Sequence, residues 1–177
     1  MFEIGSYVAY RSEGVCVISD IRAESFGAPN ASERYYILTP IRHAQSTLFV
    51  PVNSEILTSQ MRTLLSADEI NKMSAEIRED RLALPPENRM RNNLFKEILS
   101  RGERRELAVL ALTLADRIDG ILADGKKPGA TEMSAYHRAT RMLYEEFEVT
   151  TNIKSPEQVV AFLKGNFTLC EKAQIKN

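Results

Sequence analysis

Tryptophan is absent from this 177-residue sequence, and cysteine and histidine occur only twice each. Cys16 and Cys170 lie far apart, which favours a reducing compartment over a disulfide framework. Hydrophobic runs are short, because none approaches the roughly 20 residues that a membrane-spanning helix needs. The first residues, Met1–Gly5, have neither the basic nor the apolar region of a secretion signal, so we expect a cytoplasmic protein.

An excess of charge of either sign is also missing. The formal net charge is −1, which excludes a protein that coats nucleic acid through bulk positive charge. One stretch departs from this balance: residues 88–105 hold six basic and two acidic side chains, a net charge of +4. Such a stretch is typical of a solvated helix face, or of a surface that assists a DNA contact while a partner supplies most of the affinity.

The motifs that most enzyme classes need are not present. There is no glycine-rich phosphate loop and no HExxH, CxxC or GxSxG motif. Zinc needs three or four converging ligands, whereas His137 has no such set around it in the sequence. Asp116, Asp119 and Asp124 are spaced as on a solvated helix face, and Cys16 lies in an apolar segment with no basic neighbour to lower its pKa. We therefore expect no catalytic centre, no metal and no cofactor.

The first third of the chain has the pattern of short β-strands. Alternation and β-forming residues predict four strands, and a Gly/Pro/Asn/Ser-rich segment at 25–32 is typical of a hairpin loop. The predicted strands cover residues 6–10, 14–18, 34–38 and 47–52. Four or five strands in fewer than 60 residues, each followed by a turn, indicate a small antiparallel barrel or sandwich.

From Ser66 onward the apolar spacing becomes helical. Ser66 and Glu69 have the spacing of a capping box, and Gly102 is placed to end a helix in the left-handed conformation. About five helices are expected, over residues 66–80, 88–101, 103–124 and 131–148 and from Pro156 onward. The sequence therefore predicts an α+β protein in which a small antiparallel β-barrel precedes an all-α bundle of about five helices.

Several short motifs in the strand-rich part occur in a characteristic order. They are Phe2-x-Ile4-Gly5-Ser6-x-Val8-x-Tyr10, Gly14-Val15, Tyr35-Tyr36-Ile37-Leu38, Leu48-Phe49-Val50-Pro51-Val52 and Met61-Arg62. Together they resemble the polymerase-interacting domain shared by CarD-type bacterial regulators and the transcription-repair coupling factor. The helical part resembles CarD in helix order and in the Ser100-Arg101-Gly102-Glu103 break. The resemblance implies a Tudor-like, SH3-like domain over residues 1–62 and a helical, DNA-contacting domain over residues 66–177.

The resemblance also implies a way of binding RNA polymerase. The β-domain of this family adds an exposed strand edge to a sheet of the polymerase β subunit, with affinity from main-chain hydrogen bonds and specificity from alternate side chains. The matching edge consists of Thr47, Leu48, Phe49, Val50 and Pro51, and an edge strand tolerates the proline. An ordinary barrel strand with Leu48 and Val50 inside is the simpler interpretation and is compatible with this role.

For the helical domain, the resemblance implies contact with promoter DNA at the upstream edge of the transcription bubble. The family uses a basic helix start and a tryptophan that wedges into the minor groove. The matching position falls near Asn88, with Met90 half a turn further on. Methionine can unstack a base step, whereas asparagine can only hydrogen-bond in the groove. Arg89, Arg91 and Lys96 are the expected DNA-contacting cations.

The function implied is a non-enzymatic bridge. The β-domain holds the protein on polymerase and so raises the effective concentration of the helical domain at the promoter. Better binding to the open state than to the closed state then shifts the equilibrium between them. Two alternatives remain open: a protein–protein adaptor that never contacts DNA, and a small enzyme with an atypical site.

Overall fold

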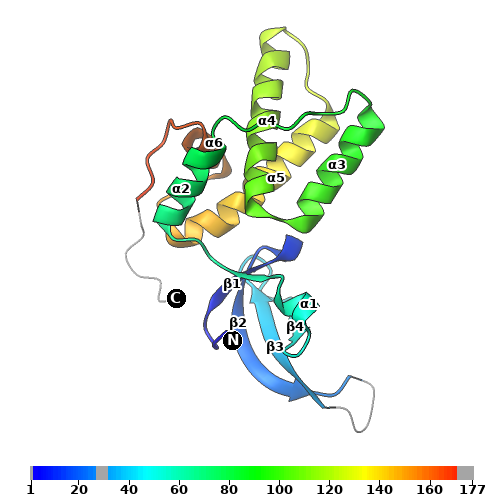
Figure 1. The fold of residues 1–177 in the computed structure, drawn as a ribbon, viewed down its shortest axis with the longest axis vertical. Helices are drawn as coiled ribbons and strands as arrows, with labels where there is room; N and C mark the ends of the chain where they lie inside the picture. Colours follow the sequence, from blue (N-terminus) through cyan, green and yellow to red (C-terminus); the bar gives the residue numbers. More distant parts are fainter. Residues whose placement is uncertain (1, 27–31, 171–177) are drawn as a thin grey trace. The chain divides into compact units, whose positions relative to one another are not determined.

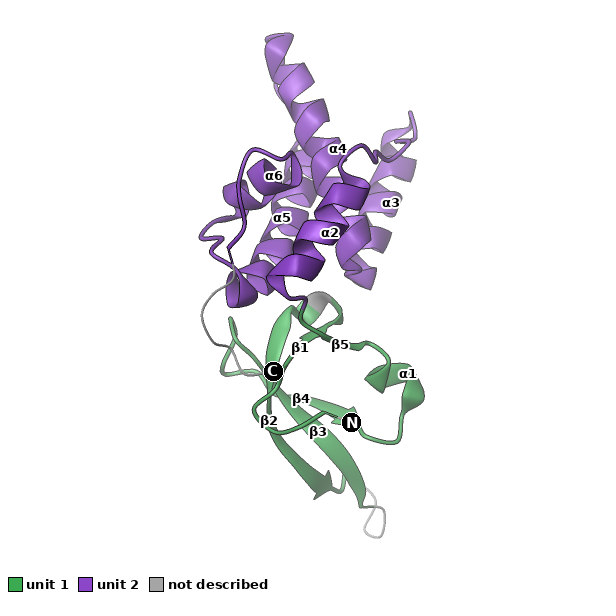
Figure 2. Cartoon of the chain, turned by 60° about the vertical axis from the view of Figure 1, so that its left-hand side comes forward, with its two compact units in different colours: residues 1–64, 174–177 green, residues 65–173 purple. Residues whose placement is uncertain are grey.

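The computed structural model describes residues 2–26 and 32–170. They divide into two compact units, with the boundary between Leu64 and Leu65 (Figure 2). The first unit contains the strands, a 3-10 turn at Arg11–Glu13 and one short α-helix, and the second contains the longer helices. No helix in these described ranges is long and apolar enough to cross a membrane.

The first unit is built on one antiparallel sheet (Figure 1). Its strand order is β4-β3-β2-β1-β5, so β4 and β5 are the two edges, and the pairings do not show the closed barrel that the sequence predicts. The hairpin of β2 and β3 is longer than predicted, with a register shift between Ile18 and Asp20. The strands are β1 (Tyr7–Tyr10), β2 (Val15–Glu24), β3 (Glu33–Pro40), β4 (Leu48–Pro51) and β5 (Met61–Thr63).

One face of this sheet forms the core of the first unit. The side chains in it alternate along the strands, as a half-buried sheet requires, and they include Val8, Cys16, Ile18, Leu38 and Val50, all at most 1% exposed. The helix α1 (Glu55–Thr58) was not expected from the sequence. A single turn is too short to show helical periodicity, and here Ser54 caps it by accepting a hydrogen bond from Leu57 N.

The described part of the second unit contains five α-helices, where the sequence predicted about five. With α1, the described residues hold six α-helices. Figure 1 shows α4 running between α2 and α3, with α5 behind it. The five helices are α2 (Ala67–Ile77), α3 (Asn88–Arg101), α4 (Arg104–Ala123), α5 (Ala130–Thr150) and α6 (Pro156–Leu163).

The helix α4 is the centre of this unit. The sequence predicts a single apolar stripe on it, but every residue from Leu107 to Ala115 is buried. A helix that is buried all round has neighbours on every side, and α2, α3, α5 and α6 all contact α4. Ala108, Ala111 and Ala115 are small and apolar. They can therefore be covered by neighbouring helices without burying a charge.

The predicted helix ends at Ser66 and Gly102 are confirmed. Ser66 Oγ accepts from Glu69 N at 3.3 Å, while Ser66 N donates to Glu69 Oε2 at 2.9 Å, which completes the capping box. These hydrogen bonds to the carboxylate lower the pKa of Glu69 below its usual range. Gly102 has φ of 64° and ends α3 in the left-handed conformation.

We expect Ser66→Ala to lower the free energy of unfolding of the helical unit by about 1 kcal/mol, because it removes the N-cap of α2. The difference in the free energy of unfolding between the variant and the parent protein should become smaller at acid pH. Since folding lowers the pKa of Glu69, its contribution is complete above the ordinary glutamate value of about 4.3 and is lost as pH falls through the lower folded value. Urea unfolding of both proteins, followed by helical circular dichroism across this pH range, measures the difference.

The matched control is Ser100→Ala, which changes an exposed serine inside α3. Its effect should stay within about 0.5 kcal/mol at every pH. Equal unfolding curves for the Ser66 variant and the parent protein would show that the capping box contributes nothing to stability.

Candidate functional site

The strand β4 is an edge of the sheet, and the peptide groups of Phe49 lie on its unpaired side. On β3, Tyr36 lies opposite Val50. Antiparallel ladders alternate hydrogen-bonded and non-hydrogen-bonded pairs. Val52 N donates to Arg34 O at 2.8 Å, so the next bonded pair contains Val50. The N–H and C=O of Phe49 therefore point away from β3, toward the open edge of the sheet.

Pro51 occupies another outward position on β4. Proline has no N–H, and at this position none is needed for pairing with β3. The Pro51 carbonyl accepts from Ser54 N at 3.2 Å, in the turn that leads into α1. The open edge is therefore short, and Phe49 supplies both its donor and its acceptor.

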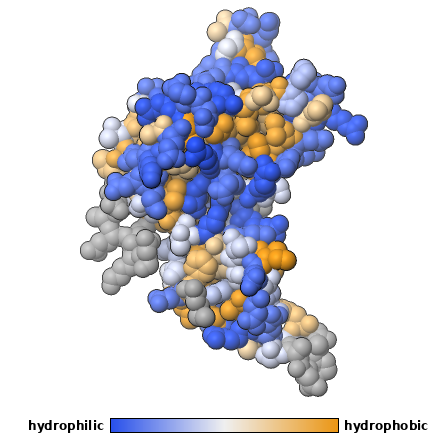
Figure 3. Space-filling view, in the orientation of Figure 1, coloured by the Kyte–Doolittle hydropathy of each residue, from blue (hydrophilic) through white to orange (hydrophobic). Residues whose placement is uncertain are grey.

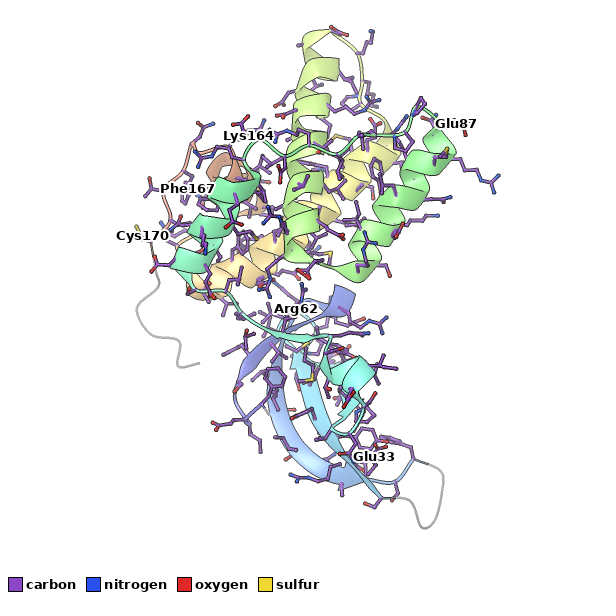
Figure 4. All side chains as sticks on the ribbon, viewed as in Figure 1. Glu33, Arg62, Glu87, Lys164, Phe167 and Cys170 are labelled. Atoms are coloured by element: carbon purple, nitrogen blue, oxygen red, sulfur yellow. The ribbon has the colours of Figure 1, made fainter. Side chains whose placement is uncertain are left out.

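A cluster of the exposed rings of Phe26 and Phe49 and the half-buried ring of Tyr35, which we call the aromatic triad, lies beside this edge. Each pair of rings meets edge to face, with centroids 5.0 to 6.3 Å apart. Phe26 is 60% and Phe49 38% exposed. Tyr35 donates to the carboxylate of Glu33, which Figure 4 labels at the start of β3. Rings exposed together in this way are typical of a binding surface.

The other face of the sheet has a hollow near the end of β4. Its volume is about 520 Å³, and it is lined by Phe2, Tyr36, Val52 and the α1 residues Glu55 and Thr58, together with Ser59. Tyr36 meets Phe2 edge to face and accepts from Phe2 N. A strand laid along β4 would therefore find the aromatic triad on one face and this hollow on the other, because its side chains alternate.

On α3, four exposed polar residues form a line that we call the α3 stripe. It consists of Arg89, Asn93, Lys96 and Ser100. Residues four, seven and eleven positions apart on a helix lie within about 60° of one another. The stripe therefore presents two cations and two small hydrogen-bonding groups along one side of the helix.

The other four basic residues of the 88–105 stretch form ion pairs with carboxylates of the same unit. The nearest contacts are Arg91 with Glu132 at 3.4 Å, Arg101 with Glu97 at 2.8 Å, Arg104 with Glu146 at 3.0 Å and Arg105 with Glu76 at 2.9 Å. The local charge of +4 in the sequence is therefore largely neutralised by acids from other turns and other helices. Arg89 and Lys96 have no such ion pair within the part of the chain that the structure describes.

The expected DNA-contacting residues thus separate into two groups. Arg89, Met90 and Lys96 are exposed on α3. The Arg91 side chain is only 12% exposed and faces the interior of its own unit, and one of its nitrogens donates to Asn88 Oδ1. Of the strand residues, Thr47 lies exposed just before β4, Leu48 and Pro51 are half-buried, and Val50 is in the core.

Comparison with known families finds a match to the first part of the chain. The family model of the CarD-like/TRCF RID domain matches residues 2–65. The N-terminal unit, which we call the RID domain, is therefore similar to this family over residues 2–65. The match covers the RID domain alone, and the helical unit beyond it lies outside. None of the curated proteins compared with the chain matches it.

Two members of the aromatic triad in the RID domain were not identified from the sequence. The neighbours Tyr35 and Tyr36 must point to opposite faces of a strand, but only the pairing of β3 shows that Tyr35 joins Phe49. Phe26 follows β2 by two residues, in a segment whose composition indicates only a loop. The alternation of side chains along a strand could therefore have placed Tyr35 on the same face as Phe49. Nothing in the local sequence could have placed Phe26 there.

The candidate reactive groups have ordinary structural roles. In the RID domain, burial, and secondly the charge of Glu13, raise the pKa of the Cys16 thiol to about 12. On the helical unit, Lys164 pairs with Asp116 at 3.1 Å and with Asp119 at 3.0 Å. Partial burial acts to raise the pKa of Asp116, but its hydrogen-bonding cations outweigh this and lower it. Nowhere in the described residues do three or more metal-ligating side chains converge.

We expect the native protein to expose one reactive thiol. Cys170 is exposed, whereas Cys16 is buried in the RID core and is held protonated. At about pH 8, a colorimetric thiol reagent should modify Cys170 within minutes and Cys16 only after denaturation, because the thiolate is the nucleophile. Cys170→Ser is the control and should leave the native protein unreactive. Rapid modification of that variant would contradict the burial of Cys16.

Proposed function

We propose that this protein is a CarD-like transcription regulator whose RID domain binds the β subunit of RNA polymerase through the edge of β4. The observation that carries the proposal is the RID family match together with an edge strand whose outward peptide groups belong to Phe49. The RID family is a family of protein-interaction domains. The protein would act in the bacterial cytoplasm, where the polymerase works, with no cofactor and no chemical step.

Strand addition fits the edge but needs support from side chains. The open part of β4 is short, because the Pro51 carbonyl is taken up by the turn and proline offers no donor. Main-chain hydrogen bonds to Phe49 alone would give a weak contact, since each bond contributes only about 1 kcal/mol net. The aromatic triad and the hollow would supply the rest, by taking alternate side chains of the added strand. Apolar contact with the triad would bury Phe26 and Phe49, which are the largest exposed rings beside the edge.

The helical unit would contact promoter DNA through the α3 stripe. Two cations, Arg89 and Lys96, are available for phosphates, and asparagine and serine in the stripe can donate hydrogen bonds. Two phosphate contacts correspond to a salt slope of about −2 in log–log units. Such binding is weak by itself, in the range of about 0.1 mM to 1 µM. It becomes useful when the RID domain holds the protein on polymerase and raises the local concentration of α3.

Met90 takes the place of the family's wedge in this proposal. It is 54% exposed on the first turn of α3, next to Arg89. An exposed methionine can enter the minor groove and unstack a base step. Asn88 is less suited to this role, because its side-chain oxygen already accepts from Arg91. Preference for the open promoter would follow, since the wedge and the stripe would meet DNA best where it is distorted.

A protein–protein adaptor that never contacts DNA is the second candidate. It is favoured by the neutralisation of four of the six basic residues in the 88–105 stretch. Both candidates use the β4 edge. The two candidates differ in whether the charge of the α3 stripe affects the lifetime of the promoter complex. The variant Arg89→Glu/Lys96→Glu described below tests this difference.

We expect Phe49→Glu to weaken capture of an isolated polymerase β-subunit fragment by at least about tenfold, because a buried charge replaces an apolar contact. Phe49→Ala and Phe49→Pro separate the side chain from the backbone. Both remove the ring, but only proline also removes the outward N–H, so proline should bind more weakly than alanine. Surface-immobilised fragment and purified full-length variants give the dissociation constants.

The matched control is Leu122→Glu, which places the same charge at an exposed leucine of α4, 55% exposed and far along the chain from β4. It should bind as the parent protein does. Equal binding by Phe49→Glu and the parent protein would rule out the β4 edge as the polymerase contact.

We expect the double variant Arg89→Glu/Lys96→Glu to shorten the lifetime of the open promoter complex, with polymerase binding retained. The parent protein's stabilising effect should decrease with salt at a log–log slope of about −2, and the variant should lose this dependence. The control Lys72→Glu/Lys127→Glu makes the same change in net charge at exposed residues outside α3. If all three proteins give the same lifetime, the adaptor is the correct function.

A further inference from the structure

A buried carboxylate in the helical unit has two arginine partners. Glu132 is 7% exposed and lies in the first turn of α5. Its Oε1 atom accepts from Arg117 Nε at 3.0 Å and pairs with Arg91 Nε at 3.4 Å. Arg117 comes from α4 and Arg91 from α3, so one oxygen joins three helices. The position suits a carboxylate, because the N-terminus of a helix favours negative charge and Gly129 provides no side-chain cap.

Arg91 also holds the chain that leads into α3. Its Nη1 atom donates to Pro85 O at 2.9 Å and to Pro86 O at 2.7 Å, and its Nη2 atom donates to Asn88 Oδ1. The two proline carbonyls precede the helix and have no partner within it. The planar guanidinium can serve two carbonyls, an amide oxygen and a carboxylate at once, which an ammonium group cannot.

The other end of this connection is held by α4. Leu82 N donates to Thr113 Oγ1 at 2.9 Å, and Thr113 Oγ1 donates in turn to Val109 O at 2.7 Å. Leu82 and Leu84 pack against the core of the unit. Figure 1 shows the connection between α2 and α3, residues 78–87, passing across α4. Figure 3 shows hydrophobic residues gathered on this part of the unit. Figure 4 labels Glu87, where α3 begins. The first turn of α3 is therefore fixed from both sides.

These contacts explain why the Arg91 side chain is largely covered although the three residues before it are exposed. Asn88, Arg89 and Met90 form the exposed start of α3, and Arg91 follows them one position later on the inward side. The pair with Glu132 holds the Arg91 guanidinium at the place where its other nitrogens reach the two proline carbonyls and Asn88. A terminal helical turn held only by water frays readily.

We propose that Glu132 is a positioning residue, which acts through Arg91 to hold Arg89 and Met90 in the geometry that DNA contact requires. The inference rests on the proposed function of α3 but assigns a role to residues that do not meet DNA. It differs from a direct phosphate contact by Arg91, because the charge of Arg91 is used inside the protein.

The two roles predict opposite effects of one substitution. Glu132→Gln removes a negative charge and leaves Arg91 and Arg117 beside a neutral amide. If these arginines bound phosphate themselves, the substitution would strengthen the DNA contact. If Glu132 positions the helix start, the substitution weakens that contact by about threefold or more, although the protein has become more positive. Arg91→Lys is the second variant: it keeps the charge but loses the fork, and it should behave as Glu132→Gln does.

The experiment combines hydrogen exchange on the free full-length protein with the lifetime of the open promoter complex. In both variants, amides of Arg91–Leu94, which donate to the carbonyls of the first turn, should lose about tenfold or more of their protection. Glu97→Gln is the matched control on the same helix, because it makes the same chemical change in an exposed pair with Arg101. Its exchange should equal that of the parent protein, and its promoter lifetime should not be shorter.

The outcomes separate the positioning role from the proposed function. Unchanged exchange at Arg91–Leu94 in both variants overturns the positioning role, as does a longer promoter lifetime with Glu132→Gln. Faster exchange combined with a shorter lifetime in both variants supports it. If Arg89→Glu/Lys96→Glu leaves the lifetime unchanged, DNA contact by α3 is wrong, and exchange then shows whether Glu132 holds the helix start.

Discussion

The alternation of bonded and unbonded pairs along β3 and β4 is the constraint on which the polymerase-binding proposal depends. One hydrogen bond, from Val52 N to Arg34 O, shows which residues of β4 face their partner strand. Phe49 is then left with its peptide groups on the open side and its ring in the aromatic triad. A shift of register by one residue would turn Val50 outward and move the aromatic side chain into the core.

The helical unit shows how little of a basic stretch can remain available after folding. Four of the six cations between residues 88 and 105 pair with carboxylates, two of them with the buried Glu132 and Glu146. A buried ion pair requires good geometry to offset desolvation, and Arg91 has it, because its remaining nitrogens also find acceptors. The charge that is left on α3 forms a narrow stripe, which suits an assisting contact rather than independent binding.

Local chemistry accounts for most of the fold that could be predicted. The capping box at Ser66, the left-handed Gly102 and the proline at the start of α6 are signals within a few residues, and each stands at its helix end in the structure. Features that need partners from elsewhere were missed. The short helix α1 is a single turn, too short to show helical periodicity, and the apolar spacing of α4 predicts one buried face but not that the other faces are covered.

The sequence by itself determined the order of strands followed by helices, the order of motifs by which residues 2–65 resemble the RID family, and the candidate strand at Phe49. Tertiary structure decided which side chains are available. It placed Phe26 and Tyr35 beside Phe49, and it turned Arg91 inward to Glu132 while leaving Arg89 outside. The physical reason is that local propensity acts over a few residues, whereas exposure and ion pairing depend on residues that only folding brings together.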